Sequence, residues 1–573
     1  MTTTVPQQED VISLEVITSP LEAVKAEGQD EKTQDQTHTV DQIHKLPETQ
    51  DREQHWLTKE THLLPKNNIW IVLPGLFLVT GLAALDQTIV TTANPTIAAD
   101  LHGGPTSISW VGSAYLLAST AVIPLCGRLS DLIGRKPVLW SAIFLFLFGS
   151  TMCGVAKNMT WLNICRGLQG VGAGGTENMV NILLGDIFPL EKRGFYGGLF
   201  DLVWAFSGLI GPLIGGALSQ SGSSWRWCFF INLPIGGLAF LVLAFNLKLN
   251  PMQKRPLEEV WKTFDKGGYL FLLAGIVLFL LGFTFAESHG FSELKAILCI
   301  AIGGALFLVF ALYECAMERY FPDKTQTIFP SRLFRNRTTL LMFLGIICRA
   351  PAFMATVFYL PVYYQAITGA SPVMSGVKML ALTLSCSLSA LISGYNISRI
   401  RRCHPTIVIS FVIMTIGTGL MTMLHADTPS VLQAIYPIIF GIGFGVISQS
   451  GVMVIQAAMP VKEMAVSGSA VYLVRFASFT VGVAVAGSIF NSGVRSNTAN
   501  ITGYDRAGLP ADQSNLRNLI HLQPPELAFQ VLKAYSDAIR SIWIVFTPIV
   551  GIGFLAVLGI REYSMTRNTV QQQ

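Results

Sequence analysis

Long runs of apolar residues alternate with short polar loops along most of the chain. Fourteen runs are long enough to cross a bilayer, because about 20 apolar residues of helix span a hydrocarbon core about 30 Å thick. They cover residues 69–90, 107–126, 138–156, 161–184, 195–218, 227–247, 268–286, 293–314, 339–364, 374–395, 406–425, 432–456, 467–490 and 539–560. The pattern predicts an all-α polytopic membrane protein with fourteen transmembrane helices.

Composition and charge agree with this interpretation. Hydrophobic residues make up 51% of the 573 residues and charged residues only 13%, about half the charged share of an ordinary soluble domain. Residues 1–68 hold 13 acidic and 6 basic residues, whereas the rest of the chain carries a net charge of +11. We expect residues 1–68 to form a disordered acidic cytoplasmic tail. The basic surplus lies in loops between apolar runs, which indicates membrane topology and not nucleic-acid binding.

Loop charges predict the orientation, because Lys and Arg accumulate on the cytoplasmic side of a membrane. Basic residues follow every second apolar run, as in residues 127–137 and at Lys192 and Arg193, and the opposite loops hold almost none. Both termini are therefore expected inside, with residues 561–573 as a second cytoplasmic tail. The long loop 491–538 is expected outside. An N-glycosylation acceptor pattern begins in it at Asn500, and its occupancy stays open.

An internal repeat divides the apolar runs into two sets. The stretch LVWAFSGLIGPLIGGAL from Leu202 aligns with LVRFASFTVGVAVAGSI from Leu473, and the glycines of the fourth run align with those of the twelfth at the same shift. Because the matching runs lie eight apart, two of them are additional to a six-helix repeat. The sequence predicts parallel six-helix bundles at 69–247 and 339–560, and a linker, 248–338, with two inserted helices. Such halves around a midplane site are typical of transporters.

A few charged residues lie within the apolar runs. They are Asp86, Arg166, Glu177, Asp201, Arg349 and Arg475. Because a charge at the bilayer centre costs roughly 2.5–3.5 kcal/mol, such residues tend to face a cavity or a partner. Asp86 and Arg166 are the first candidates for proton coupling, since desolvation favours a neutral carboxyl and a nearby guanidinium favours the ionised form. A static buried ion pair would use the same residues. For Glu177, contact with a cationic substrate, a proton site and a water-exposed helix end all stay open.

Two further segments suggest moving parts. In residues 127–137, GRLSDLIGRKP, Asp131 precedes Arg135 by four residues, so the two can form a charge latch, although a basic cytoplasmic loop would need no latch. In the run 195–218, glycines permit close helix packing, and Pro212, after Gly211, removes a backbone hydrogen bond and kinks the helix. Static packing would use the same glycines.

These segments together resemble the major facilitator superfamily. Residues 127–137 resemble its signature G-x-L-x-D-x-x-G-R-K-P, the sequence RGLQG from Arg166 resembles its proton-associated arginine motif, and SGLIGPLIGG from Ser207 resembles the motif of its antiporters. LDQTIVTTANP from Leu85 and WRWCFFINLP from Trp225 point to the fourteen-helix drug:proton antiporters and to fungal toxin and multidrug efflux pumps. The resemblance covers roughly residues 69–565. It implies a secondary transporter that exports small organic molecules in exchange for protons, by alternating access.

The expected partners are a small-molecule substrate, protons and membrane lipid. Polar and aromatic positions on the runs are the candidates for the substrate cavity: Tyr115, Gln169, Glu177, Asn178, Trp204, Phe353, Tyr359 and Gln449. We expect a monomer in the plasma membrane, with the vacuolar membrane as the alternative. Uptake or vacuolar transport of basic amino acids or iron chelates is an alternative function.

Other classes of function find little support. The nine cysteines form no C-x-x-C pattern and have no histidine spacing suited to zinc. GVGAGG from Gly170 fits G-x-G-x-x-G, but it lies within an apolar helix with no preceding strand, so it does not indicate a dinucleotide site. No phosphate-binding loop motif occurs, so we do not expect ATP to be the energy source. We expect no cofactor, no metal and no enzyme activity; a membrane enzyme or nutrient sensor is the remaining alternative.

Overall fold

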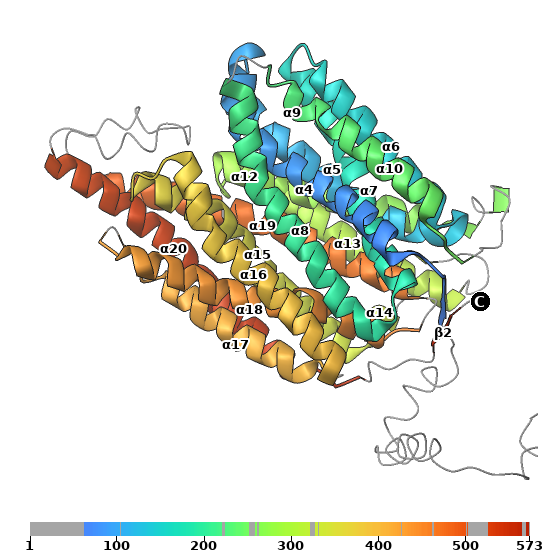
Figure 1. The fold of residues 1–573 in the computed structure, drawn as a ribbon. Coiled ribbons are helices and arrows are strands. Elements are labelled where there is room, and N and C mark those ends of the chain that lie inside the picture. Colours follow the sequence, from blue (N-terminus) through green and yellow to red (C-terminus); the bar gives the residue numbers. More distant parts are fainter. Residues whose placement is uncertain are drawn as a thin grey trace, which may run out of the picture. The chain divides into compact units, whose positions relative to one another are not determined.

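A computed structural model describes most of the 573-residue chain. The residues described are 62–103, 105–220, 224–250, 258–259, 263–320, 327–329, 332–400, 402–425, 427–460, 463–499, 501, 525–563 and 569–571. Within them the chain forms fourteen long helices, two helices of four residues and two strands of three residues (Figure 1). The all-α fold predicted from the sequence is confirmed.

The helices follow the order that the sequence predicts. The first set consists of α4 (Ile69–Asp100), α5 (Pro105–Ile133), α6 (Arg135–Gly154), α7 (Met159–Ile187), α8 (Leu190–Gln220), the short α9 (Trp227–Phe230) and α10 (Asn232–Asn246). The inserted pair consists of α12 (Lys266–His289) and α13 (Leu294–Tyr320), followed by the short α14 (Arg332–Arg335). The second set consists of α15 (Arg337–Ala366), α16 (Pro372–Ile400), α17 (His404–Met421), α18 (Ser430–Ala457), α19 (Met464–Thr498) and α20 (Pro525–Val557).

The two sets of six helices pack in the same way. In the first half α7 packs between α5 and α6, and in the second half α18 packs between α16 and α17. Gly172 of α7 lies against the backbone of Phe146 on α6, and Gly443 of α18 lies in the same way against Met414 on α17, in each case with no room for a Cβ atom. Since these glycines are 271 residues apart, the repeat in the sequence is also a repeat in the packing.

Contacts between the halves follow the same symmetry. Helix α8 of the first half packs along α16 of the second, and α19 of the second half packs along α5 of the first (Figure 1). The inserted helices pack mainly against each other, and α12 also contacts α5 and α19. Large apolar side chains of α13 point outward, among them Leu308 and Leu312 at 69% and 72% exposure, as expected of a helix that faces lipid.

Thirteen described helices are long and apolar enough to cross a membrane by length and composition alone. Helix α7 is not among them, although it has 29 residues and most of its side chains are buried. It carries Arg166, Glu177 and Asp186, and these charges lower its mean hydropathy. The fourteenth predicted crossing is therefore present as a helix, but as one that is shielded by its neighbours.

Two predicted boundaries differ from the structure. Helix α20 begins at Pro525, so the predicted loop 491–538 is helical at both ends. Only one face of its first turns is buried, including Val531 and Tyr535. The other face is mostly polar, so the mean hydropathy of this stretch is low and the sequence predicted a loop. At the other boundary, the strand β1 (His62–Leu64) pairs in parallel with β2 (Thr569–Gln571), so the predicted tails include ordered residues. Residues 1–61 of the tail lie outside the described residues.

Candidate functional site

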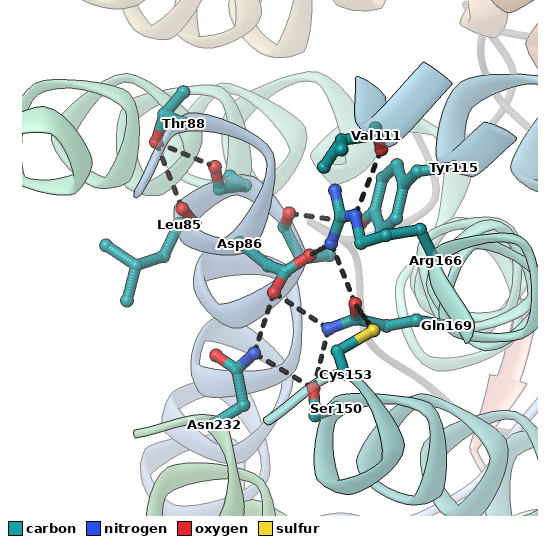
Figure 2. Close-up of polar contacts among 12 residues, drawn as sticks. Leu85, Asp86, Thr88, Val111, Tyr115, Ser150, Cys153, Arg166, Gln169 and Asn232 are labelled. Carbon is teal, nitrogen blue, oxygen red and sulfur yellow. Dashed lines mark hydrogen bonds and ion pairs between the residues drawn. The ribbon is translucent and has the colours of Figure 1, made fainter. Parts of the chain in front are cut away.

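Asp86 of α4 is the centre of a buried hydrogen-bond network in the first half (Figure 2). Its Oδ2 accepts a hydrogen bond of 2.6 Å from Nη1 of Arg166, and its Oδ1 accepts one of 2.8 Å from Nε2 of Gln169 and one of 2.8 Å from Nδ2 of Asn232. Asp86 is 0% exposed. Each of these three side chains donates to the carboxylate, so the oxygens of Asp86 act as acceptors in all three bonds.

Arg166 of α7 is equally well held. Its Nε donates to the backbone oxygen of Val111 at 3.1 Å, its Nη1 also donates to Oε1 of Gln169 at 2.7 Å, and its guanidinium lies 4.3 Å from the ring centroid of Tyr115. Ser150 of α6 accepts from Gln169 at 2.6 Å. The network therefore joins α4, α5, α6, α7 and α10, and each of its two charges is neutralised by the other.

Helix α8 packs closely on α4 one turn beyond Asp86. A Cβ atom at Gly211 would overlap the side chain of Thr88 and lie 3.0 Å from the backbone nitrogen of Ile89. Pro212 lies within α8, as predicted. Because α8 also packs along α16 of the second half, a shift between the halves would act directly on the helix that carries Asp86.

Asp131 in the last turn of α5 lies against Arg135, the first residue of α6, as the latch prediction requires. Arg135 also donates from Nε to Oδ2 of Asp186 at 2.9 Å and from Nη1 to Oγ of Ser130 at 2.8 Å. Asp186 lies near the end of α7 and was not singled out in the sequence. The sequence shows Asp186 only as an acidic residue near the end of the helix that carries Arg166. The fold shows that this end of α7 contacts Arg135.

Hydrogen bonds join the two halves at the end of the bundle where α5, α7, α16 and α18 finish. We call this the basic end, because Arg135 at the start of α6, Arg193 at the start of α8 and Arg402 after α16 lie there. Asn178 donates to Oγ of Ser469 at 3.1 Å, and Arg193 donates to Oε1 of Gln456 at 2.9 Å. Further bonds across the halves run from Tyr472 to Asn181 and from Ser398 to the backbone oxygen of Glu191, each at 2.5 Å. The halves are closed against each other at the basic end.

A second group of charges lies between the halves. Glu177 of α7 and Asp201 of α8 belong to the first half, and Arg349 of α15 and Arg475 of α19 belong to the second. Arg475 interacts electrostatically with both carboxylates. Asp201 accepts a hydrogen bond of 3.1 Å from Nε2 of Gln449. The sequence placed all of these charges within helices, but it did not show that they meet.

The candidate cavity residues do not share one site. Tyr115 and Gln169 belong to the Asp86 network, and Asn178 forms part of the closed basic end. Glu177 and Gln449 belong to the charge group between the halves, and Phe353 is near it, stacked on Phe444. Tyr359 packs against Phe490, and Trp204 is partly exposed on α8. Asn500 lies outside the described residues.

At the end of the bundle opposite the basic end, Asp100 joins α4 to the start of α9. Its Oδ2 accepts a hydrogen bond of 2.8 Å from Nε1 of Trp225 and one of 2.9 Å from Nη1 of Arg226. The hydrogen bonds from Trp225 and Arg226 lower the pKa of Asp100 from its usual value. Among the described residues, no group of three or more His, Cys, Asp or Glu side chains is placed to hold a metal ion.

Comparison with known proteins settles the family. Residues 76–314 and 317–483 match the family model described as Major Facilitator Superfamily. The chain belongs to this superfamily. It is 37% identical over 517 residues to an uncharacterized MFS-type transporter of Schizosaccharomyces pombe, in an alignment that covers 89% of this chain and 84% of that protein.

Further relatives agree with the fold and with the predicted resemblance to fungal efflux pumps. The chain is 32% identical to the efflux pump dotC of Dothistroma septosporum, over 88% of this chain and 86% of that protein. Among solved structures, the proton:xylose symporter XylE has a similar fold, with a TM-score of 0.54 at 13% identity. The superposition covers 87% of this chain and 97% of the XylE chain. At this identity the likeness concerns the fold alone.

Proposed function

We propose that this membrane protein exports small organic molecules in exchange for protons, by alternating access. The observation that carries the proposal is the buried pair of Asp86 and Arg166, at 0% and 1% exposure, within a superfamily of transporters. Similarity to relatives such as the efflux pump dotC supports export as the direction of transport.

The pair offers a simple means of coupling. While Arg166 donates to Asp86, the ionised carboxylate is stabilised and needs no proton. If Arg166 moves away, the buried carboxylate keeps only the neutral donors Gln169 and Asn232, so the neutral acid becomes more favourable and a proton binds. Binding and release of a proton then accompany two arrangements of α4 and α7. Asp86 accepts the proton in this scheme, and Arg166 determines when it does so.

The movement reaches the other half through α8. Thr88 and Ile89, next to Asp86 on α4, pack against Gly211 of α8, and α8 packs along α16. With the Lys- and Arg-rich loops in the cytoplasm, the closed basic end faces the cytoplasm. The Asp131–Arg135–Asp186 group stabilises this closed arrangement, and the opposite state requires the contacts at the basic end to separate.

The location follows from the same reasoning. The efflux-pump relatives and the loop charges support a plasma-membrane protein with both termini in the cytoplasm, and no step of the coupling scheme needs a second copy of the chain. Uptake or vacuolar transport would use the same fold, so the direction of flux distinguishes these functions.

The test uses purified full-length protein in liposomes with an imposed pH gradient and a fluorescent organic dye. We expect dye movement against its gradient when protons flow in the opposite direction, and no accumulation once the pH gradient is collapsed. Asp86→Asn is expected to lose accumulation while retaining exchange of labelled for unlabelled dye. Asp100→Asn, a matched aspartate outside the network, is expected to retain both. Accumulation that survives collapse of the gradient, or that Asp86→Asn leaves intact, excludes this coupling scheme.

A further inference from the structure

Arg349 of α15 is a buried cation that forms no ion pair with any described residue, although it interacts electrostatically with Asp201. It is 2% exposed, and its Nε and Nη1 have no hydrogen-bond partner in the part of the chain that the structure describes. Among the described residues, no carboxylate oxygen lies within 4.0 Å of its guanidinium nitrogens. Arg166 in the first half, by contrast, is paired with Asp86 and bonded to Val111 and Gln169. A buried guanidinium in this condition is unfavourable unless an anion binds to it.

An aromatic surface lies beside Arg349. The guanidinium carbon is 5.0 Å from the ring centroid of Phe444, and Phe444 is stacked on Phe353 with centroids 3.8 Å apart and an interplanar angle of 8°. The ring centroid of Phe479 lies 6.1 Å from that of Phe353. We call these three rings the aromatic floor. All three rings are buried, at 2–7% exposure, so a flat apolar molecule can pack against them only when the halves move apart.

A second guanidinium lies beside Phe479 of the aromatic floor. The guanidinium carbon of Arg475 is 5.5 Å from the ring centroid of Phe479, and no described residue forms a hydrogen bond with its Nε. Arg349 and Arg475 repel each other electrostatically. A bound anion would relieve this repulsion and supply acceptors for the unpaired N–H groups.

The first half presents two carboxylates to the same region. Glu177 is 8% exposed and its Oε1 accepts no hydrogen bond from any described residue, while Asp201 accepts one from Gln449. Arg475 interacts with both carboxylates without forming an ion pair within 4.0 Å to either of them in the part of the chain described. Positive charge therefore belongs to the second half and negative charge to the first, and an anionic ligand would compete with Glu177 and Asp201 for the arginines.

We propose that Arg349, Arg475 and the aromatic floor form the binding site for the transported molecule, and that this molecule is an organic acid. Its carboxylate pairs with Arg349, and its flat apolar part packs against the aromatic floor when the halves move apart. The inference rests on the proposed export function and names the substrate class. It also gives the exchange a physical basis, because the anion displaces the carboxylates of the first half from the arginines of the second.

The test compares two probes that differ in one group, pyrene-1-butyrate and pyrene-1-butanol. Binding is measured by fluorescence titration of full-length protein in nanodiscs, with empty nanodiscs to correct for partition into lipid. Since a hydrogen bond to a charged group adds a factor of about 10 to 100 in affinity, we expect the wild type to bind the acid at least about 10-fold more tightly than the alcohol. Arg349→Gln is expected to remove this difference and to leave alcohol binding within about 2-fold.

Two further variants make the test specific. Glu177→Gln removes a competing negative charge, so it is expected to strengthen binding of the acid by a few fold and to leave alcohol binding unchanged. Arg540→Gln is the matched control: Arg540 on α20 also has an unpaired buried Nε, but it makes none of the contacts with the aromatic floor described above. This control is expected to keep the preference of the wild type for the acid.

Equal binding of the two probes by the wild type, binding of neither probe, or a parallel loss of both in Arg349→Gln overturns this site. So does weaker acid binding in Glu177→Gln. The outcome is separable from that of the proposed function, since selective binding of the acid without proton-driven flux would contradict antiport and leave the site intact.

Discussion

Asp86 and Arg166 are 80 residues apart in the sequence and form an ion pair of 2.6 Å in which neither side chain is more than 2% exposed. The pair lies within the first half only. In the second half Arg349 and Arg475 have no ion-pair partner within 4.0 Å among the described residues. The duplicated halves thus share a backbone arrangement and differ in their buried charges, which permits one half to handle protons and the other to bind a ligand.

Removal of one charge of the pair is expected to destabilise the protein more than removal of both. Arg166→Gln leaves Asp86 as an uncompensated buried charge, so we expect a loss of about 3–5 kcal/mol in the free energy of unfolding. The double variant Asp86→Asn/Arg166→Gln is expected to recover most of that loss. Thermal unfolding of the single and double variants in nanodiscs measures these losses. A double variant as unstable as the sum of the two single variants would show that the pair is not coupled.

Much of the fold could be predicted because membrane helices follow from apolar length. The fourteen helices were visible in the sequence, since lipid requires each crossing to satisfy its own backbone hydrogen bonds. The repeat at a shift of 271 residues was visible as aligned glycines. The helix ends were harder to predict. The first turns of α20 are amphipathic around Val531 and Tyr535, so they resemble a polar loop when averaged over a window.

The site was predictable only in part. Asp86 and Arg166 stood out because charges in apolar runs are rare. Gln169 was recognised as polar, but its assignment to a cavity did not anticipate that its amide would join Arg166 to Asp86. Asp186 meets Arg135 only through the packing of α7 beside the loop. Such contacts depend on helix rotation and tilt, which one sequence without its fold does not fix.

A disulfide across the basic end is expected to lock the closed state. Asn178 and Ser469 belong to different halves and their side chains are hydrogen-bonded at 3.1 Å, so cysteines at both positions should form a disulfide under mild oxidation. We expect transport to fall to background in Asn178→Cys/Ser469→Cys and to recover when the bond is reduced. Each single variant, treated in the same way, serves as the control. Full transport by the cross-linked protein would mean that this end does not open.

The acidic partner of Arg135 on α7 is expected to favour closure. Asp186→Asn removes one of the two carboxylates that Arg135 contacts. Because both side chains are partly exposed, the effect should be modest, about 1 kcal/mol or roughly 5-fold in the equilibrium between closed and open states. The rate of disulfide formation in Asn178→Cys/Ser469→Cys follows the closed population and should fall by up to that factor. An unchanged rate would show that Asp186 does not stabilise closure.

The contact at Asp100 is expected to weaken in acid. The pKa of Asp100 is lower in the folded protein than in the unfolded chain, so its contribution to stability is complete above about pH 4 and is lost as the pH falls through the lower folded value. Because the side chain is half exposed, the effect on the melting temperature should be small, about 1 °C. The difference between wild type and Asp100→Asn, measured by differential scanning fluorimetry, should therefore shrink below about pH 4. A difference in melting temperature that grows in acid would contradict a lowered pKa of Asp100 in the folded protein.

Close packing of α8 on α4 is expected to be necessary for coupling, and two glycines of α8 allow a matched test. A Cβ atom at Gly211 would overlap Thr88, whereas one at Gly216 would meet no atom within 4 Å. Gly211→Ala should cost about 1–3 kcal/mol in stability through overpacking, and it should separate α4 from α8 beside Asp86. We therefore expect Gly211→Ala to lower proton-driven accumulation of dye more than exchange of dye, while Gly216→Ala changes neither. Equal losses of accumulation and exchange in Gly211→Ala would indicate a packing defect without a specific role in coupling. Equal behaviour of the two variants would remove the α4–α8 contact from the mechanism.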